Sequence, residues 1–238
     1  PQSNLLTNKC KYLNVEEIFE YINRTKKNHP AHIGNTHTNV VHFNIRSLDK
    51  HFSELISFHE QTQHVFDYTG LSEIGKKNLE SRKAFLQTMG YDLHYKESHL
   101  SKGGAGLITK LDTEHRIRHD LVFENKKYKK VNLVTESIWL EREFEDKKRN
   151  FIIGAVYRHP GSTAECLEDF TQQLNSIIQK IEKENKKVYI VGDLNIDGMK
   201  VTENKKVENF FNMLMVTNYI TLKTKPKRAK DNAIPHQT

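Results

Sequence analysis

Short runs of apolar, β-branched and aromatic residues recur along the chain from residue 39, and several of them end in polar residues. Runs of this length without helical spacing predict buried strands. Polar or glycine-containing turns separate the middle runs, which favours hairpins. The predicted strands are NVVHFNI, HVFDYTGLSE, YDLHYKES, GGAGLITK, VNLVTESIWLERE, FIIGAVYR and KVYIVGDLNID.

Other segments carry apolar residues three and four positions apart, the spacing of a helix with one buried face. LDKHFSELISFHEQ and KNLESRKAFLQTMG are two of these, and Gly90 ends the second. A long helix is predicted from a capping box at Ser162 through Lys183, and another from about Lys205 to Val216. A shorter candidate covers Val15 to Ile22.

Helices interspersed with single strands and hairpins predict an α/β fold in which two packed sheets have helices outside them. A length of 238 residues is compatible with one such domain. We expect a polar leader over residues 1–38, the main domain over 39–226 and a basic irregular tail over 227–238. No feature of the sequence indicates an oligomer, so we expect a monomer.

The composition narrows the class of protein only modestly. The net charge of +7 favours a polyanionic partner, although lysine-rich surfaces are often only solubilising. Cys10 and Cys166 lie far apart and form no CxxC motif, which favours a reducing compartment and structural roles. The N-terminal residues do not resemble a signal peptide, and no apolar run reaches the roughly 18 residues of a membrane span. We therefore expect a nuclear or cytoplasmic protein that is not secreted.

Polar side chains follow the predicted strands at Asn44, Glu73, Asp193 and Asn195. Phosphodiester hydrolysis requires a divalent cation on oxygen ligands and an activated water, and carboxylates and amides supply such groups. On an extended backbone, Asp193 and Asn195 would point to the same face. Each residue also has a simpler interpretation, because Asp and Asn form turns, Asn44 could cap a helix near Leu48, and single glutamates usually lie at the surface.

Five blocks in order resemble the endonuclease domain of non-LTR (LINE-type) retrotransposons, a member of the endonuclease/exonuclease/phosphatase superfamily. The blocks are HFNIRSL, GLSE, GGAGLITK, IIGAVYRHP and VGDLNID, within a match from about Asn39 to Pro226. The resemblance implies a four-layered α/β sandwich and a Mg²⁺-dependent nick in DNA, with Mn²⁺ as a substitute metal. The nick would leave a 3′ hydroxyl that primes a reverse transcriptase domain of the intact element.

The resemblance also assigns roles by position. Glu73 matches the metal-binding glutamate, and Asn44 matches the asparagine that supports the metal and the phosphate. Tyr157 matches the tyrosine at the scissile phosphate, although it could instead be a core aromatic whose hydroxyl reaches solvent. Asp193 matches the aspartate that orients or deprotonates the attacking water, and Asn195 matches its phosphate-binding partner.

Arg46 and Arg158 adjoin these positions and are predicted to contact DNA phosphates, with surface solvation as the alternative. Asp197 has no comparable catalytic role and is predicted to start a turn or helix. The family's late aspartate and final Ser-Asp-His motif have no match here, and His236 lacks the preceding Ser-Asp. We therefore expect a C-terminally truncated domain without its last strands, and a weak or inactive nuclease. A non-catalytic nucleic-acid-binding remnant and a phosphatase of the same superfamily remain alternatives.

Overall fold

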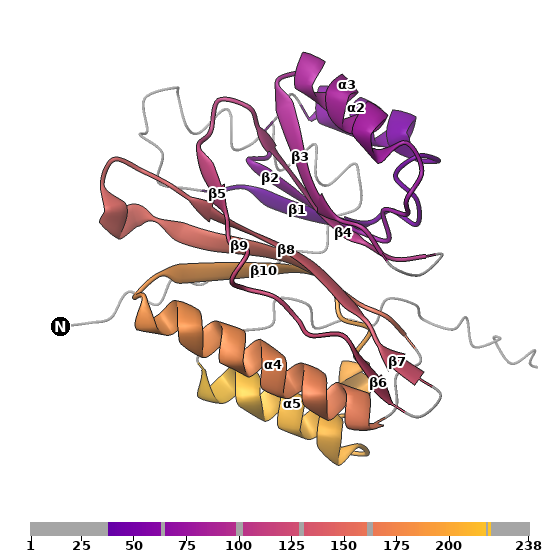
Figure 1. The fold of residues 1–238 in the computed structure, drawn as a ribbon, viewed down its shortest axis with the longest axis vertical. Coiled ribbons are helices and arrows are strands. Elements are labelled where there is room, and N and C mark those ends of the chain that lie inside the picture. Colours follow the sequence, from indigo (N-terminus) through magenta and orange to yellow (C-terminus); the bar gives the residue numbers. More distant parts are fainter. Residues whose placement is uncertain are drawn as a thin grey trace, which may run out of the picture.

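The computed structural model describes residues 38–62, 65–98, 102–128, 131–160, 164–217 and 219. The candidate helix at 15–22, the capping box at Ser162 and the basic tail lie outside these residues. Figure 1 shows four layers, in which two mixed sheets face each other and each carries helices on its outer side. This confirms the predicted α/β sandwich. Among the described helices, none has the length and apolar character that a membrane crossing requires.

The first sheet has the strand order β1-β2-β4-β3. β1 and β2 are parallel, and the other two pairs are antiparallel. Its strands are β1 (Val40–Asn44), β2 (Tyr68–Ser72), β3 (Tyr91–Lys96) and β4 (Ala105–Lys110).

The second sheet has the order β10-β9-β8-β5, with β9 and β10 parallel. A small antiparallel pair, β6 with β7, lies outside both sheets. The sequence pattern missed β5 and β6, because each is only three residues long and too short to show a period. The strands are β5 (His115–Ile117), β6 (Lys126–Tyr128), β7 (Val131–Leu133), β8 (Thr135–Arg142), β9 (Phe151–Arg158) and β10 (Lys187–Asp193).

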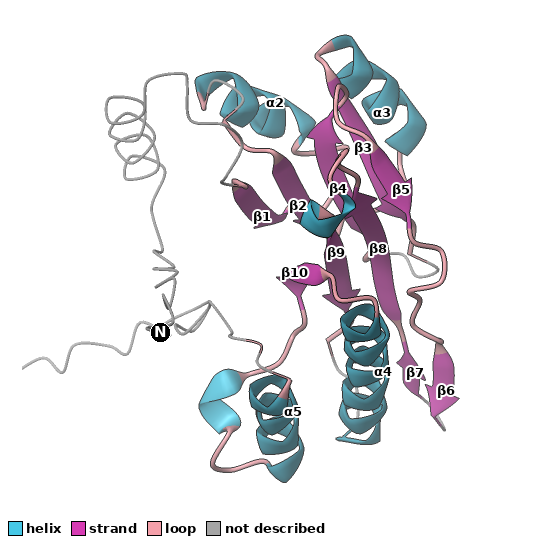
Figure 2. Ribbon diagram, turned by 90° about the vertical axis from the view of Figure 1, so that its left-hand side faces the viewer, coloured by secondary structure: helices cyan, strands magenta, loops and turns pink. Residues whose placement is uncertain are grey.

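The helices lie where the apolar spacing predicted them. Two helices cover the outer face of the first sheet: α2 (Phe52–Gln61) and α3 (Leu79–Thr88). Two more cover the outer face of the second sheet: α4 (Ala164–Lys183) and α5 (Lys205–Val216) (Figure 2). The predicted apolar stripe of α4 is buried throughout, at Leu167, Phe170, Leu174, Ile177, Ile178 and Ile181. Two 3-10 turns, η1 (Lys147–Arg149) and η2 (Gly198–Lys200), complete the elements.

Three apolar clusters separate the four layers. One joins α2 and α3 to the first sheet, one joins α4 and α5 to the second, and the third fills the space between the sheets. The sheets approach closely at Gly70, where an added Cβ would lie 2.5 Å from a methyl carbon of Val191. Glycine in β2 therefore lets β10 pack directly over it.

The two parallel pairs set where the polar strand ends meet. Asn44 is in register with Ser72, and Asp193 with Tyr157. The carboxyl ends of parallel strands lie at the same edge of a sheet, the usual location of chemistry in α/β folds. Contacts of β10 with β1 and β2 hold the two edges together. The fold therefore collects the ends of β1, β2, β9 and β10 at one end of the sandwich, which we call the site end.

Candidate active site

The amide of Asn44 joins two acidic side chains from different sheets. Its Nδ2 donates to Glu73 Oε1 at 2.7 Å and to Asp193 Oδ2 at 2.9 Å. Asn44 is the last residue of β1, and α2 begins only at Phe52, so the helix-cap alternative for Asn44 is wrong. Residues separated by about 150 positions are thus brought into one polar cluster.

Glu73 lies just after β2 in a left-handed backbone conformation, with φ at 59°. Its amide N–H donates to the carbonyl of Gly104, and that of Gly75 donates to the carbonyl of Gly103. An unfavourable backbone angle at a non-glycine residue persists only where neighbouring contacts enforce it, and such residues gather at functional sites. Backbone hydrogen bonds to the Gly103-Gly104 turn therefore hold the backbone of Glu73 in place.

Asp193 ends β10 and is 3% exposed. Its second oxygen, Oδ1, accepts from the Asn195 N–H at 3.1 Å. Asn195 has φ at 49°, so the strand has already ended there and the expected alternation of an extended backbone does not apply. The Asn195 amide instead donates to the carbonyl of Arg158 at 2.6 Å. Asp197 accepts from the N–H of Met199 as the cap of η2, which confirms that it starts a turn.

Tyr157 faces the space between the sheets and is 2% exposed. Burial raises the pKa of its hydroxyl above the usual range, and the nearby charges of Glu73 and Glu136 raise it further. A hydrogen bond with Glu73 acts in the same direction, whereas one with Asn195 opposes it. The hydroxyl thus remains protonated at neutral pH and reaches the cluster. Tyr157 is a core aromatic, as the alternative interpretation expected, but its hydroxyl does not reach solvent.

The two arginines differ from each other. Arg46 is exposed and adopts φ at 53° in the loop after β1. Arg158 is only 4% exposed, and its guanidinium donates to the carbonyls of Leu194 at 2.7 Å and Asn195 at 2.8 Å. We therefore correct the expected DNA contact of Arg158, because in this conformation its side chain is used to fix the loop after β10. Arg46 remains a predicted phosphate contact.

The donor set of the cluster suits a hard divalent cation. The Asn44 Oδ1 atom is buried without a hydrogen-bond partner among the described residues. Turning the amide around would bring this oxygen against the two carboxylates, so the present orientation is the favourable one. One amide oxygen and two carboxylates are ligands that Mg²⁺ accepts. No cluster of three or more His, Cys, Asp or Glu side chains that could hold a metal occurs in the described part of the chain, so the amide is essential to this interpretation.

Comparisons with known proteins agree with the architecture. No protein-family model matches the sequence, and no curated protein matches it. Among solved structures, the human Nocturnin catalytic domain with bound sulfate matches with a TM-score of 0.53 at 14% identity, covering 73% of this chain and 68% of that one. An endonuclease/exonuclease/phosphatase family protein from Bacteroides thetaiotaomicron matches with a TM-score of 0.51 at 15% identity, covering 74% and 66%.

A third match is the 3′ phosphatase NExo from Neisseria bound to a product DNA hairpin, with a TM-score of 0.51 at 12% identity, covering 76% and 71%. The chain has the endonuclease/exonuclease/phosphatase fold. It spans about two thirds of the length of these three structures. Identities this low concern the fold alone, and the function has to be argued from the site.

Within this endonuclease/exonuclease/phosphatase fold, three polar residues beside the cluster escaped the sequence analysis. They are Ser98, Glu136 and His159, all in contact with one another. The available signal was the charged residue Glu136 inside the predicted strand VNLVTESIWLERE, between its two apolar parts. A glutamate buried in the middle of a sheet needs hydrogen-bond partners, which a sequence pattern cannot locate.

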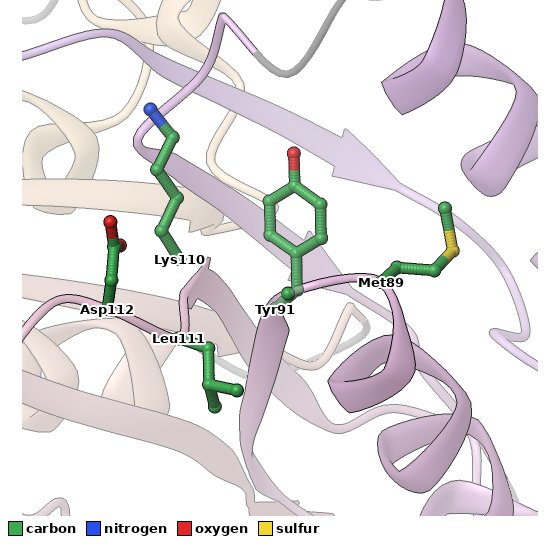
Figure 3. A pocket seen from close by; sticks show the side chains of 6 residues that line it. Met89, Tyr91, Lys110, Leu111 and Asp112 are labelled. Atoms are coloured by element: carbon green, nitrogen blue, oxygen red, sulfur yellow. The ribbon is translucent and has the colours of Figure 1, made fainter.

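The described residues also line a cavity of about 540 Å³ that lies away from the cluster. Figure 3 shows its lining, in which the polar tips of Tyr91 and Lys110 point the same way. Tyr91 and Lys110 are paired across β3 and β4 at the end opposite to Ala105, which pairs with Ser72 next to Glu73. The cavity therefore belongs to the far end of the first sheet, and the chemical cluster at the site end does not depend on it.

Proposed function

We propose that the chain is a metal-dependent DNA endonuclease domain of retrotransposon type, which hydrolyses a phosphodiester bond and leaves a 3′ hydroxyl. The observation that carries the proposal is the Asn44 amide, which joins Glu73 to Asp193 and whose buried oxygen has no hydrogen-bond partner among the described residues. The five sequence blocks support the retrotransposon relationship, and the fold agrees with it. A reverse transcriptase domain is the corresponding partner in the intact element.

The residues divide the work of hydrolysis between them. The Glu73 carboxylate would hold Mg²⁺, and Asn44 would join it through Oδ1 after its amide turns, an orientation that the charge of the cation makes favourable. When bound, the cation supplies positive charge against the phosphate. Asp193 accepts a proton from the attacking water, and its bond with the Asn195 N–H fixes the direction of its carboxylate. The Tyr157 hydroxyl, protonated at neutral pH, would turn from Glu73 to donate to a phosphate oxygen. The second N–H of the Asn195 side-chain amide, whose first N–H is bonded to the Arg158 carbonyl, would donate to another phosphate oxygen. Arg46, exposed beside Asn44, contacts a neighbouring phosphate of the DNA.

Nicking of supercoiled plasmid tests the proposal, with Mg²⁺, with Mn²⁺ and with EDTA. We expect Glu73→Gln and Asp193→Asn each to lower the nicking rate by roughly 100-fold or more, since each removes a charge worth several kcal/mol in the transition state. Glu208→Gln is the matched control, because it removes a half-buried carboxylate of α5 whose ion pair within the described part of the chain is with Lys205. Extension of the nick by a DNA polymerase checks for the 3′ hydroxyl.

The alternatives give different results in the same assay. A folded chain that binds DNA but does not nick it, with or without the two substitutions, would contradict the endonuclease and support a nucleic-acid-binding remnant. The match to the 3′ phosphatase NExo suggests the substrate on which the phosphatase alternative should be tested. Release of inorganic phosphate from a 3′-phosphorylated oligonucleotide, without nicking of plasmid, would support that alternative instead.

A further inference from the structure

Glu136 is a buried carboxylate at the site end that the proposed reaction does not use. It lies near the start of β8 and is 1% exposed. Ser98 Oγ donates to its Oε1 at 2.6 Å, and His159 Nε2 lies 3.0 and 2.9 Å from its two oxygens. A buried charge is stable only when such partners compensate for the lost hydration. The three side chains therefore form one compact unit, which we call the Glu136 cluster.

The Glu136 cluster connects the two sheets. Ser98 follows β3 of the first sheet, whereas Glu136 belongs to β8 of the second. The Gly104 N–H also points to Glu136 Oε2, at 3.5 Å. The same turn accepts the Glu73 N–H at the Gly104 carbonyl. Glu136 is thus linked to the strained Glu73 backbone through a single residue.

A second connection runs to Tyr157. Glu136 and Tyr157 are directly opposite each other across β8 and β9. The ring of His159 packs edge-on against the ring of Tyr157, with centroids 4.8 Å apart. The charge of Glu136 also contributes to the raised pKa of the Tyr157 hydroxyl. Glu136 therefore acts on Tyr157 both through packing and through its electric field.

The turn that meets the cluster depends on glycine. Gly103 has φ at 120°, and an added Cβ there would lie 2.5 Å from His159 Nε2. Gly104 has φ at 90°, and its Cβ would lie 2.7 Å from a side-chain carbon of Ile74. Both positions combine a backbone angle that favours glycine with a close approach. The backbone of the turn can thus reach the Glu136 cluster and the Glu73 loop at once.

We propose that Glu136 is a positioning residue of the active site, which fixes Tyr157 through His159 and fixes Glu73 through the Gly103-Gly104 turn. The Glu136 carboxylate accepts from His159 Nε2–H, so it sets the orientation of the imidazole that supports the Tyr157 ring. Glu136 itself touches neither metal nor substrate. The inference rests on the proposed function for its catalytic consequence, but the positioning itself can be measured separately.

Glu136→Gln tests the proposal. Glutamine keeps the size of the side chain, but it replaces one carboxylate oxygen with an NH₂ group that faces the Ser98 hydroxyl and the His159 N–H. The matched control is Glu141→Gln, on the same strand and also 1% exposed, but engaged with Arg116, Arg118 and Lys186 at the other end. Three quantities are compared in the full chain: the nicking rate, Mn²⁺ affinity by calorimetry, and NMR shifts of the Glu73 and Gly104 amides and the His159 ring nitrogens.

In Glu136→Gln we expect a loss of roughly 10- to 100-fold in nicking and in Mn²⁺ affinity, as for other residues that orient metal ligands. We also expect shifts of the Glu73, Gly104 and His159 signals that Glu141→Gln does not produce. Unchanged Mn²⁺ affinity together with unchanged Glu73 and His159 signals would overturn the proposal. If the wild-type chain neither nicks DNA nor binds Mn²⁺, the proposed function fails, and the NMR shifts alone decide on the positioning.

Two milder variants keep the test decisive if Glu136→Gln does not fold. Ser98→Ala removes one donor to the carboxylate, and His159→Gln replaces the ring that supports Tyr157. Each should move the Glu73 or Tyr157 signals in the direction expected for Glu136→Gln, with a smaller loss of Mn²⁺ affinity for Ser98→Ala. Wild-type signals in both variants would overturn the proposal as well.

Discussion

The two buried glutamates of β8 show how differently its two ends are built. Glu136, at the site end, is held by a serine hydroxyl and a histidine. Glu141, at the far end, lies 2.6 Å from Arg116, 3.2 Å from Arg118 and 2.7 Å from Lys186. The two positions are five residues apart, so their side chains point to opposite faces of the sheet. Glu136 faces the other sheet, and Glu141 faces the helices.

At the far end the charges balance one another. Burial alone would raise the pKa of Glu141, but Lys186 and Arg116 outweigh it, and the pKa is lowered. Arg118 continues the network to Asp120 at 2.8 Å and to Glu184 at 2.5 Å. At the site end, by contrast, Glu73 and Asp193 share one neutral amide, and the buried Arg158 is turned to backbone carbonyls. We infer that the far end serves stability, whereas the site end gathers carboxylates whose charge a bound cation would neutralise.

Arg118→Ala should therefore disrupt the charge network around Glu141 at the far end of β8, while the site end stays unchanged. The Arg118 side chain is 4% exposed, and its loss leaves the buried Glu141 with less compensating positive charge. Removing one partner of a buried ion pair commonly costs about 3–5 kcal/mol. Urea denaturation at neutral pH measures the loss of unfolding free energy, and Mn²⁺ affinity below the transition should stay at the wild-type value. A loss below about 1 kcal/mol would contradict a stabilising far end.

Gly192→Ala should disturb the site end through the backbone. Gly192 precedes Asp193 and has φ at 150°, and an added Cβ would lie 1.8 Å from the Val156 carbonyl oxygen on β9. We expect a stability loss of about 3 kcal/mol and loss of nicking, because backbone cannot yield as a side chain can. Gly90→Ala is the control, since Gly90 also has positive φ (82°) but nothing within 4 Å of the added Cβ. An equal effect of both substitutions would show that the backbone angle alone matters.

Much of the sheet layout could be predicted from the sequence, because apolar periodicity directly reports burial. The strands KVYIVGD and FIIGAVYR and the long stripe of α4 lie where the pattern indicated. Asn44, Glu73 and Asp193 could be singled out because they follow strands and match the motifs. Their common contact could not be predicted from periodicity, since it depends on how β1 and β10 of different sheets pack.

Three features of the site were beyond any pattern of single residues. Arg158 looks like a DNA contact in the sequence, yet its burial follows from carbonyls that the loop after β10 turns inward. Asn195 departs from strand alternation because its φ is positive. Glu136 and His159 meet only through the antiparallel pairing of β8 and β9 and the turn of the chain at Gly103. Such contacts join residues that are far apart in the sequence. No local sequence pattern marks the residues that make them.

A link between the sheets at the far end provides a pH-dependent counterpart to the Glu136 cluster. His115 of β5 donates through Nδ1 to the Thr113 carbonyl at 2.9 Å and accepts from the Tyr68 hydroxyl of β2 at 2.8 Å. Burial, with the charges of Arg142 and His94, lowers the pKa of His115 to about 4, against the opposing effects of its hydrogen bond to Thr113 and of the Asp92 charge. The neutral ring is thus the form that the folded chain prefers.

The folded pKa of His115 lies below its unfolded value, so the unfolded chain binds more protons between about pH 6.5 and 4. The unfolding free energy should therefore fall as the pH falls through this window, by about 3 kcal/mol from His115. Urea denaturation of wild type and His115→Gln at several pH values isolates the contribution of His115. The other titrating groups contribute equally to the pH dependence of both proteins. Parallel pH profiles of the two proteins would contradict the assignment to His115.

Arg116→Ala should have the smallest effect and shows whether burial or distance governs the far end. Arg116 lies closer to Glu141 than Arg118 does, at 2.6 Å against 3.2 Å, but its side chain is 55% exposed. If distance decided, Arg116→Ala would be the more damaging substitution. Because water and salt screen an exposed charge, we expect a loss of about 0.5 kcal/mol, well below that of Arg118→Ala. Urea denaturation at low and high salt measures the unfolding free energy of both variants. We expect Arg118→Ala to lose more, because Arg118 is buried. Equal losses of unfolding free energy would mean that the contact distance matters more than burial.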